Sequence, residues 1–397
     1  MGQPLSAIPR DDVPALPTVL REWGRIGSLG FGGPPAHIRL LRDLCVTRHS
    51  WLNPAEFEDA VAACNLLPGP AATLLAILCA WRVRGAAGAM VGGVAFILPG
   101  FVLIVALAVL FLSDSPPAWI LAAGAGAGAA VAAVAIHAAV DLIPGSWRRA
   151  RSATSRGWMR WLVYVALGAC AAATLGPFIV LVLLACGVAE VLIRSRPDLA
   201  RTHSVGPVVA LAYVIGSVTG VWAAIAWVAF KVGALSYGGG FVIVPLMQGD
   251  AVDRYHWMTA PQFLNAVALG QITPGPVVLT VAVVGYAAAG LAGAALAATV
   301  AFSPSFIFVL TGARHFDRLR TNRRASAFLA GAGPAAIGAI LGSVVPLSRA
   351  LTQPWQWAVL LGAALLLLVF RRSTILTLLL AAAVGVVLVL LGVPLPA

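Results

Sequence analysis

Charged residues are scarce in this chain of 397 residues: they make up 10% of it, against roughly 25% in a soluble domain. Only 14 residues are acidic, and one lysine, Lys231, stands among the 26 Lys and Arg residues. So low a charge content argues against an ordinary soluble domain. The first 17 residues lack the apolar core of a signal peptide, so we expect no cleaved leader.

Cysteine is also sparse, and its spacing indicates no chemistry. There is no CxxC motif and no pairing of cysteine with histidine at metal-ligand spacing. The sequence therefore predicts no metal site and no cofactor at the five cysteines, Cys45, Cys64, Cys79, Cys170 and Cys186. The apolar runs contain no HExxH motif, His cluster or paired carboxylates, which argues against a membrane-embedded enzyme.

Hydrophobic residues are abundant instead, at 60% of the chain with a mean hydropathy of +0.95. They form recurrent runs of about 20 residues, the length that crosses the hydrocarbon layer as a helix. The runs are unbroken and rich in Ala, Leu and Val, which favours helices over a barrel. The net charge of +12 falls between the runs, so it indicates orientation in a lipid bilayer and not binding to nucleic acid. The sequence predicts an all-α polytopic membrane protein.

The chain contains an internal repeat. The stretch WGRIGSLGFGGPPAHI (23–38) aligns with AFKVGALSYGGGFVIV (229–244), which pairs Arg25 with Lys231 at an offset of 206 residues (231 − 25). The same offset carries the motif Pro68-Gly69-Pro70 onto Pro274-Gly275-Pro276. Because glycines, prolines and the cation agree together, we predict two homologous halves, at about 15–200 and 205–392, after an N-terminal tail at 1–14.

Each half is predicted to hold a Gly-turn segment, a segment interrupted at the Pro-Gly-Pro (PGP) motif, and four plainer spans. The plainer spans lie at about 86–112, 117–143, 161–175 and 177–193, and again at about 291–313, 325–347, 354–370 and 373–392. The Gly-turn segments are expected to be re-entrant or tilted half-spans. The total is about ten membrane crossings.

Basic residues cluster in loops that are not equivalent in the two halves. Arg82 and Arg84 and the loop at 148–160 carry them in the first half, whereas the loop at 314–324 carries them in the second. Cytoplasmic loops collect Lys and Arg, so equivalent loops are expected on opposite faces, which predicts an inverted-topology repeat. Arg371-Arg372 fits the same map as one more cytoplasmic loop.

Inverted repeats are typical of secondary transporters, whose substrate site lies at the midplane where interrupted segments of both copies meet. One such pair is the glycine turn, whose bare amides can form an anion-binding nest. A cation, Arg25 or Lys231, precedes each turn, and a buried cation needs a partner or a wet cavity. The alternatives are a snorkelling anchor for the cations and close helix packing for the glycines. The turn glycines are Gly32 and Gly33, and Gly238, Gly239 and Gly240.

The second pair is the PGP motif. Proline removes a donor and clashes with the preceding turn, so each motif splits its span, and the half-helix starting near Pro70 or Pro276 points a positive N-terminus into the interior. An amide, Asn65 or Gln271, stands three residues before the first proline in both copies. Because all these groups attract negative charge, they predict an oxyanion site. Further candidates are the hydroxyls of Thr73 and Thr273, and His37 after the first glycine turn.

Acidic residues are assigned smaller roles. Asp59 aligns with Asn265 and is a candidate for proton coupling. Glu56 and Glu58 are interpreted as the acidic N-terminus of a helix. Asp141 and Glu190 lie near span ends and are expected at the membrane interface.

At these residues the sequence resembles the chromate ion transporter (CHR) family in its two-domain form. The motifs are FGGPPAHI (31–38), WLNPAEF (51–57) and NLLPGP (65–70) in the first half, and KVGALSYGGG (231–240), WMTAPQFLNAVALGQITPGP (257–276) and SPSF (303–306) in the second. The resemblance implies chromate efflux across the bacterial cytoplasmic (inner) membrane, with sulfate as a competitor or exchange partner. The sequence departs from the family pattern at Ala71-Ala72 and at the positions after each glycine turn, where runs of acids are weakened to Arg42-Asp43-Leu44 and Gln248-Gly249-Asp250.

Alternatives remain open at this stage. A carrier of the same fold could import or exchange sulfate or another oxyanion, because helix breaks do not encode direction. A channel is a third alternative, which saturable flux with counter-transport would distinguish. The sequence does not determine the coupling ion or whether the chain forms a homodimer.

Overall fold

The computed structural model describes residues 13–65, 69–113, 115–153, 156–174, 179–194, 220–236, 241–313 and 322–394. Within these ranges the protein is all-α, with helices and turns and no strand. The predicted all-helical, multi-pass class is therefore correct at this level.

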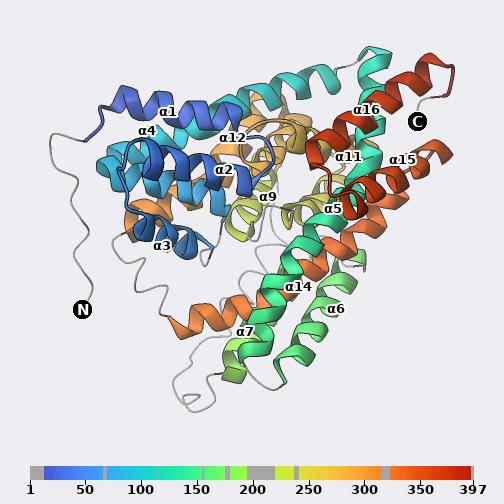
Figure 1. The fold of residues 1–397 in the computed structure, drawn as a ribbon. Helices are drawn as coiled ribbons and strands as arrows, with labels where there is room; N and C mark the ends of the chain where they lie inside the picture. The colour runs from blue at the N-terminus through green and yellow to red at the C-terminus, as the bar shows by residue number, and fades with distance from the viewer. Residues whose placement is uncertain are drawn as a thin grey trace.

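The described part of the first half contains seven α-helices and one π-helical turn (Figure 1). They are α1 (Leu16–Leu29), α2 (Pro34–Arg42), the π-helical turn η2 (Asp43–Arg48), α3 (Pro54–Cys64), α4 (Ala71–Phe111), α5 (Ala118–Ala153), α6 (Gly157–Thr174) and α7 (Ile179–Arg194).

The described part of the second half follows a similar order. Its elements are α9 (Val221–Leu235), α10 (Ile243–Gln248), the π-helical turn η5 (Gly249–Arg254), α11 (Ala260–Ile272), the 3₁₀ turn η6 (Val277–Leu279), α12 (Thr280–Gly312), α14 (Arg323–Arg349), α15 (Pro354–Ala364), the π-helical turn η8 (Leu365–Val369) and α16 (Thr374–Leu390).

Matching local signals start the same helix in each half. Asn53 caps α3 by accepting a hydrogen bond from the Glu56 amide, and the Glu56 carboxylate accepts one from the Asn53 amide. Thr259 and Gln262 make the same reciprocal pair at the start of α11. Such a capping box satisfies two amides that the first helical turn leaves free. The acidic residue at position 56 is thus a helix cap.

The chain leaves helical geometry at both PGP motifs. Helix α3 ends at Cys64 and α4 begins at Ala71, whereas α11 ends at Ile272 and η6 begins at Val277. The central glycines, Gly69 and Gly275, have φ of 122° and 98°, a conformation that residues with a Cβ rarely adopt. Proline on both sides removes the amides that would continue the helix, so the break follows directly from the three residues.

Helices α4 and α12 each fold back on themselves. Gly85 and Gly290 have nearly identical backbone angles, φ of 63° and 62° with ψ of −154° and −152°. A Cβ on Gly88 would lie 2.4 Å from the carbonyl oxygen of Ala80, and one on Gly285 would lie 2.4 Å from that of Gly293. A straight helix would separate each of these pairs by about 12 Å. Each helix is therefore a short half-helix followed by a reversal and a long helix.

The two halves interlock at the PGP motifs through reciprocal contacts. A Cβ on Gly275 of the second half would lie 3.5 Å from Gly100 Cα and 3.8 Å from the Gly27 carbonyl oxygen. A Cβ on Gly69 of the first half would lie 3.4 Å from Ser305 Oγ and 3.5 Å from the Gly233 carbonyl oxygen. Gly27, Gly69 and Gly100 of the first half correspond to Gly233, Gly275 and Ser305 of the second. The two sets of contacts are therefore equivalent with the halves exchanged, as expected for a two-fold relation.

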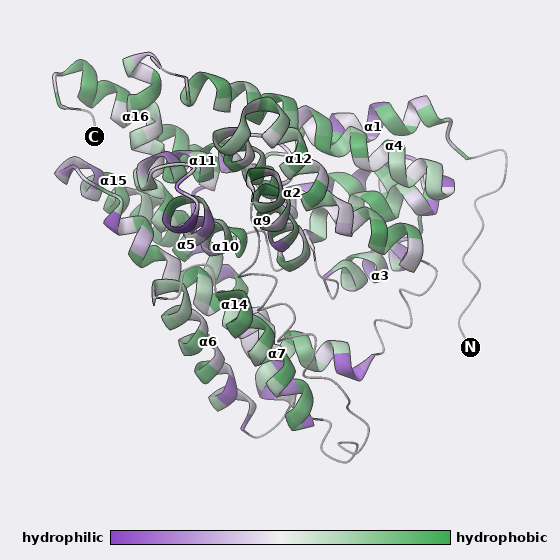
Figure 2. Ribbon diagram, turned by 180° about the vertical axis from the view of Figure 1, so that it is seen from behind, coloured by the Kyte–Doolittle hydropathy of each residue, from purple (hydrophilic) through white to green (hydrophobic). Residues whose placement is uncertain are grey.

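Among the described residues, four helices are long and apolar enough to cross a membrane, at 71–111, 118–151, 277–312 and 323–349. Three shorter apolar helices, at 221–235, 354–369 and 374–390, accompany them. Figure 2 shows hydrophobic colour along most of each helix and hydrophilic colour gathered at helix ends and turns. The protein is a multi-pass membrane protein.

The backbone packing of α9 against α12 gives a testable prediction. A Cβ on Gly233 would lie 2.0 Å from the carbonyl oxygen of Ala301, whereas one on Gly362 would meet nothing within 4 Å. We expect Gly233→Ala to destabilise the fold by about 1–3 kcal/mol or more through overpacking. Gly362→Ala, also in a helix interior, should be neutral or slightly stabilising. Thermal denaturation of the detergent-solubilised protein measures both, and equal stability of the two variants would contradict the packing described here.

Candidate functional site

A cavity of about 610 Å³ opens where the glycine turn of the first half meets the PGP segments of both halves. Its wall includes four predicted site residues: Gly32, Gly33, Asn65 and Gln271. The remaining wall comes from the starts of α2, α4, η6 and α16, from one face of α5, and from the turn before α10; these residues are Pro34, Pro35, Ala71, Val134, His137, Ala138, Asp141, Leu142, Phe241, Val277, Arg371, Arg372, Ser373, Thr374 and Ile375.

A small chamber of about 20 Å³ adjoins the cavity and shares four wall residues with it, Gly33, Pro34, Ala71 and Val277. Its other residues are His37, Pro70, Ala72, Thr73, Pro276 and Val278. A space of this size accommodates about one water-sized group. The two PGP motifs, which lie 206 residues apart (276 − 70), thus form one common wall.

The chamber is lined by residues at the starts of α2, α4 and η6. The first helical bond of α4 runs from the Leu74 amide to the Pro70 carbonyl, and that of η6 from the Leu279 amide to the Pro276 carbonyl. The amides before those bonds have no helical acceptor, and they belong to Ala71, Ala72 and Thr73 in α4 and to Val277 and Val278 in η6. The start of α2 adds few donors, because its first two residues are Pro34 and Pro35.

Two side-chain donors around the chamber and cavity are buried without a hydrogen-bond partner. The hydroxyl of Thr73 is one of them, and its side chain is fully buried. The His37 side chain is also fully buried, and its ring lies against the backbone of Gly30. The Gln271 Nε2 group, like the Thr73 hydroxyl, is unpartnered and belongs to a side chain on the cavity wall. Asn65 is exposed on the same wall. Buried polar groups normally find partners, so these atoms fit a site that a polar ligand completes.

Other predicted site residues lie behind this wall. Gly69 and Gly275 are buried in the contact between the halves, and the Pro274 carbonyl lies against Gly100. Thr273 donates its hydroxyl to the Leu269 carbonyl at 2.8 Å. Pro68, Gly238, Gly239 and Gly240 lie outside the described residues.

Lys231 is buried but does not line the cavity. Its ammonium group forms an ion pair with Asp250 in η5, and the two side chains are 2% and 0% exposed. The ring of Trp227 lies 5.7 Å from the ammonium nitrogen, within cation–π range. The partner that a buried cation requires is therefore a carboxylate of the same half.

Arg25 and Asp59 also lie away from the cavity wall. Arg25 is exposed on α1, although it occupies the position equivalent to Lys231. Asp59 is exposed on α3. The structure thus does not bring the two predicted cations together on the cavity wall.

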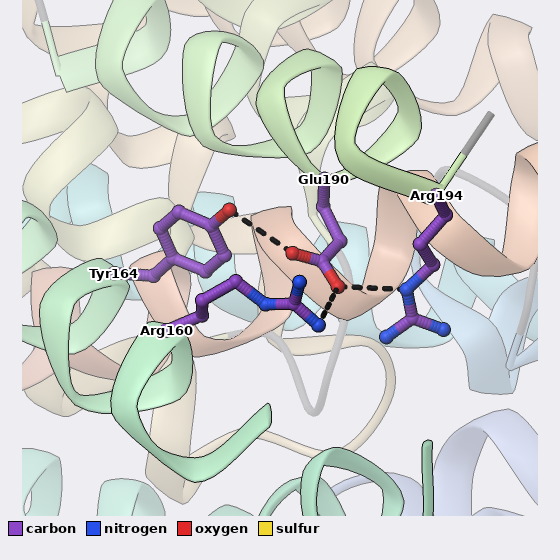
Figure 3. Close-up of polar contacts among 4 residues, drawn as sticks. All are labelled: Arg160, Tyr164, Glu190 and Arg194. Carbon is purple, nitrogen blue, oxygen red and sulfur yellow. Dashed lines mark hydrogen bonds and ion pairs between the residues drawn. The ribbon is translucent and has the colours of Figure 1, made fainter. Parts of the chain in front are cut away.

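A second buried ionic cluster joins α6 and α7 (Figure 3). Glu190 accepts a hydrogen bond from the Tyr164 hydroxyl at 3.0 Å, and its other oxygen pairs with Arg194 at 2.7 Å and with Arg160 at 3.3 Å. The Glu190 side chain is only 3% exposed, so it is enclosed by protein near its span end. A carboxylate neutralised in this way fits a structural link between two helices. The described residues contain no group of three or more His, Cys, Asp or Glu side chains placed to hold a metal ion.

Sequence reasoning missed the charged side chains that do line the cavity. His137 and Asp141 form an ion pair at 3.5 Å on one face of α5, a spacing of four residues that could have identified the pair. Arg371 and Arg372 were assigned to a cytoplasmic loop by the charge rule, yet they line this cavity. Asp250 was counted only as a remnant of a weakened acidic run.

Comparison with known proteins gives one consistent family. The family model described as chromate transporter matches residues 18–191 and 222–386. The chain is 32% identical to a chromate transport protein of Cupriavidus metallidurans over 82% of this chain and 80% of that protein. It is 32% identical to a probable chromate transport protein of Synechococcus elongatus over 82% of each chain. It is 29% identical to a chromate transport protein of Pseudomonas aeruginosa over 85% of this chain and 82% of that protein. No solved structure matches the chain.

The ion pair of Lys231 and Asp250 gives the second prediction. Asp250→Asn leaves a buried ammonium group without its counter-ion, which costs about 3–5 kcal/mol. Lys231→Met with Asp250→Leu removes both charges and should recover most of that stability. Asp253→Asn, on an exposed residue of the same turn, should change stability by no more than about 0.5 kcal/mol.

Thermal denaturation in detergent measures all three variants. If Asp250→Asn proved as stable as Asp253→Asn, the structural role of the pair would be wrong. Transport by the double variant then separates the two roles of Lys231: a folded but inactive protein would indicate that the cation acts on the substrate.

Proposed function

Because the chain belongs to the chromate transporter family, we propose that it is a secondary active transporter that exports chromate across the bacterial cytoplasmic membrane. Family membership and the apolar helices make it a multi-pass membrane protein of an ion-transporting family. The proposal adds the direction, the site and the mechanism. Its expected effect in the cell is resistance to chromate.

One observation carries the proposal: residues at the starts of both PGP half-helices, whose first amides have no helical acceptor, line one chamber beside a larger cavity. Helix N-termini attract anions through these amides and through the helix dipole, equivalent to roughly +0.5 charge at each end. The amides of Gln271 and Asn65 add donors at the cavity wall. A tetrahedral dianion could place one oxygen in the chamber and the others in the cavity.

The wall offers donors far more than acceptors, which favours an anion over a neutral or cationic substrate. The one carboxylate on the wall is Asp141, which pairs with His137. A cation would find few acceptors there. Chromate and sulfate share the shape and charge that this donor set fits.

Alternating access around the site is the mechanism we propose. Two lines support it: basic residues cluster in loops that are not equivalent in the two halves, and each PGP motif packs reciprocally against the other half. In transporters built from inverted repeats, one repeat rocks against the other around a fixed midplane site. In this proposal direct contact with the substrate belongs to Gly32, Gly33, Asn65, Gln271 and the chamber amides.

The runner-up is a sulfate or other oxyanion importer or exchanger of the same fold. Chromate uptake into inverted membrane vesicles, compared with sulfate uptake, separates the two. Export predicts that vesicles accumulate chromate and that excess sulfate competes. Vesicles that take up sulfate but not chromate would support the runner-up.

In cells, expression of the protein should lower chromate accumulation several-fold relative to a strain without it, because export opposes chromate entry. The measurement is intracellular chromium at fixed external chromate, with and without excess sulfate. Unchanged or higher accumulation at equal protein level would contradict chromate export.

Gln271 provides the test of the site itself. We expect Gln271→Ala to raise the KM for chromate about tenfold or more, because a hydrogen bond to a charged group is worth about 1.5–3 kcal/mol. The control is Gln262→Glu, at the other end of the same helix and away from the cavity, because a glutamate there keeps the capping box with Thr259. A KM for Gln271→Ala equal to that of the control would remove Gln271 from the site.

A further inference from the structure

Two adjacent arginines, Arg371 and Arg372, lie at the tip of a helical hairpin formed by α15, η8 and α16. Both side chains line the cavity that holds Asn65 and Gln271. Figure 1 shows the two arms of the hairpin converging from the edge of the molecule on α5 and α11. Ile375, just after the tip, would lie 4.0 Å from a Cβ on Gly32, so the tip reaches the glycine turn of the first half.

The hairpin tip lies beside the middle of α5 and not at its end. A Cβ on Gly126 would lie 2.1 Å from the Ala381 carbonyl oxygen, and one on Gly385 would lie 2.2 Å from that of Ala122. These contacts show that α16 runs antiparallel to α5. The start of α16 lines the same cavity as His137 and Asp141 of α5. Helix α5 continues to Ala153, about 18 Å further at 1.5 Å per residue (153 − 141 = 12 residues).

The arms of the hairpin are short. The first arm, at 354–369, and the second, α16 at 374–390, have 16 and 17 residues. At 1.5 Å per residue they span about 24–26 Å, less than the roughly 30 Å of the hydrocarbon layer. Arms of this length are at the short end of the range for a membrane crossing, and the tip residues 368–373 are exposed.

The backbone holds the tip in one conformation. The Arg372 amide donates to the Leu366 carbonyl at 2.9 Å, and Ser373 Oγ accepts from the Leu376 amide at the start of α16. Arg371 has a φ of 50°, at a helix end where glycine or asparagine is the usual residue. The sequence thus places a large cation where a smaller residue would be less strained.

The two charges of the tip have no ion-pair partner among the described residues. The one acidic residue named on the cavity wall, Asp141, lies 3.5 Å from His137 Nε2. The cavity wall thus carries two arginines against one carboxylate. Arginine binds oxyanions through planar, forked donors, often two bonds at a time.

We propose that Arg371 and Arg372 are the cationic part of the substrate site and that the pair selects doubly charged oxyanions over singly charged ones. The proposal rests on the oxyanion transport proposed above and names the residues that set its charge preference. The pair belongs to the second half alone, because the corresponding loop of the first half reads LGPF (175–178). In this proposal Arg371 and Arg372 have the role of substrate-binding cations, which the sequence analysis assigned to Arg25 and Lys231.

A topology signal is the competing explanation, since arginines in cytoplasmic loops orient membrane proteins. A topology signal requires only positive charge near a loop and no particular contact. A substrate contact requires the charges to face the cavity, and replacement by lysine should preserve charge but lose the forked geometry. The two explanations therefore differ in measurable ways.

The test uses the full-length protein in liposomes, with chromate and sulfate as dianions and nitrate as a monoanion competitor. We expect Arg371→Gln with Arg372→Gln to raise the KM for chromate at least about tenfold and to reduce the preference for chromate over nitrate. Arg371→Lys with Arg372→Lys should recover part of the loss. The matched control is Arg323→Gln with Arg324→Gln, another exposed arginine pair that begins a helix but lies away from the cavity.

Three outcomes would overturn the proposal. They are a KM for the glutamine pair equal to that of the control, a selectivity that does not change, and an altered orientation of a C-terminal reporter. Single substitutions and size-exclusion profiles show whether a lost activity reflects a lost fold. If the wild-type protein itself transports neither chromate nor sulfate, the proposed function fails, a result distinct from failure of the arginine pair alone.

Discussion

Close contact between backbones at a few glycines is the constraint on which the rest of this fold depends. Gly27 packs closely against the Phe96 backbone of its own half, and Gly233 against that of Ala301 in its own half. Each PGP motif then packs against two helices of the other half, α1 and α4 or α9 and α12, and a side chain at Gly100 would occupy space that the Pro274 backbone already fills. This contact brings the two half-helix starts to one chamber. Without it the amides of the two motifs would face separate surroundings, and neither set alone would surround an ion.

The electrostatic arrangement follows from the cost of charge in a membrane. A fixed buried cation is expensive unless it is paired, and Lys231 is paired with Asp250. Helix dipoles and backbone amides carry no net charge. The protein can therefore bury them without acidic partners when no anion is bound. The arginines of the hairpin tip lie at the exposed wall of the cavity, where water can solvate them when no anion is bound.

Much of this arrangement could be predicted because glycine and proline act locally. The PGP motifs and the glycine turns specify their own backbone, so Gly33, Asn65 and Gln271 could be grouped from sequence alone, and the structure places them on one cavity. The fate of the cations could not be predicted. Arg25 and Lys231 occupy equivalent positions, but Asp250 pairs with Lys231, whereas the position equivalent to Asp250 in the first half is Leu44 (250 − 206). Which face of a helix is buried depends on such distant partners. The number of arginines in a loop likewise does not indicate how deep in the membrane the loop lies, so it could not show that Arg371 lines a cavity.

Under the alternating-access mechanism proposed above, the arginine pair makes the two halves unequal, and that inequality bears on how the site meets the two sides of the membrane. With identical halves, the inward-open and outward-open forms would surround the ion with the same charges and hold it equally well. A cationic tip on one half alone gives the two forms different surroundings for the ion. The substrate concentration that gives half-maximal transport would then differ between the two sides of the bilayer. Because net flux must vanish at zero driving force, the maximal rates in the two directions would have to differ in the same proportion.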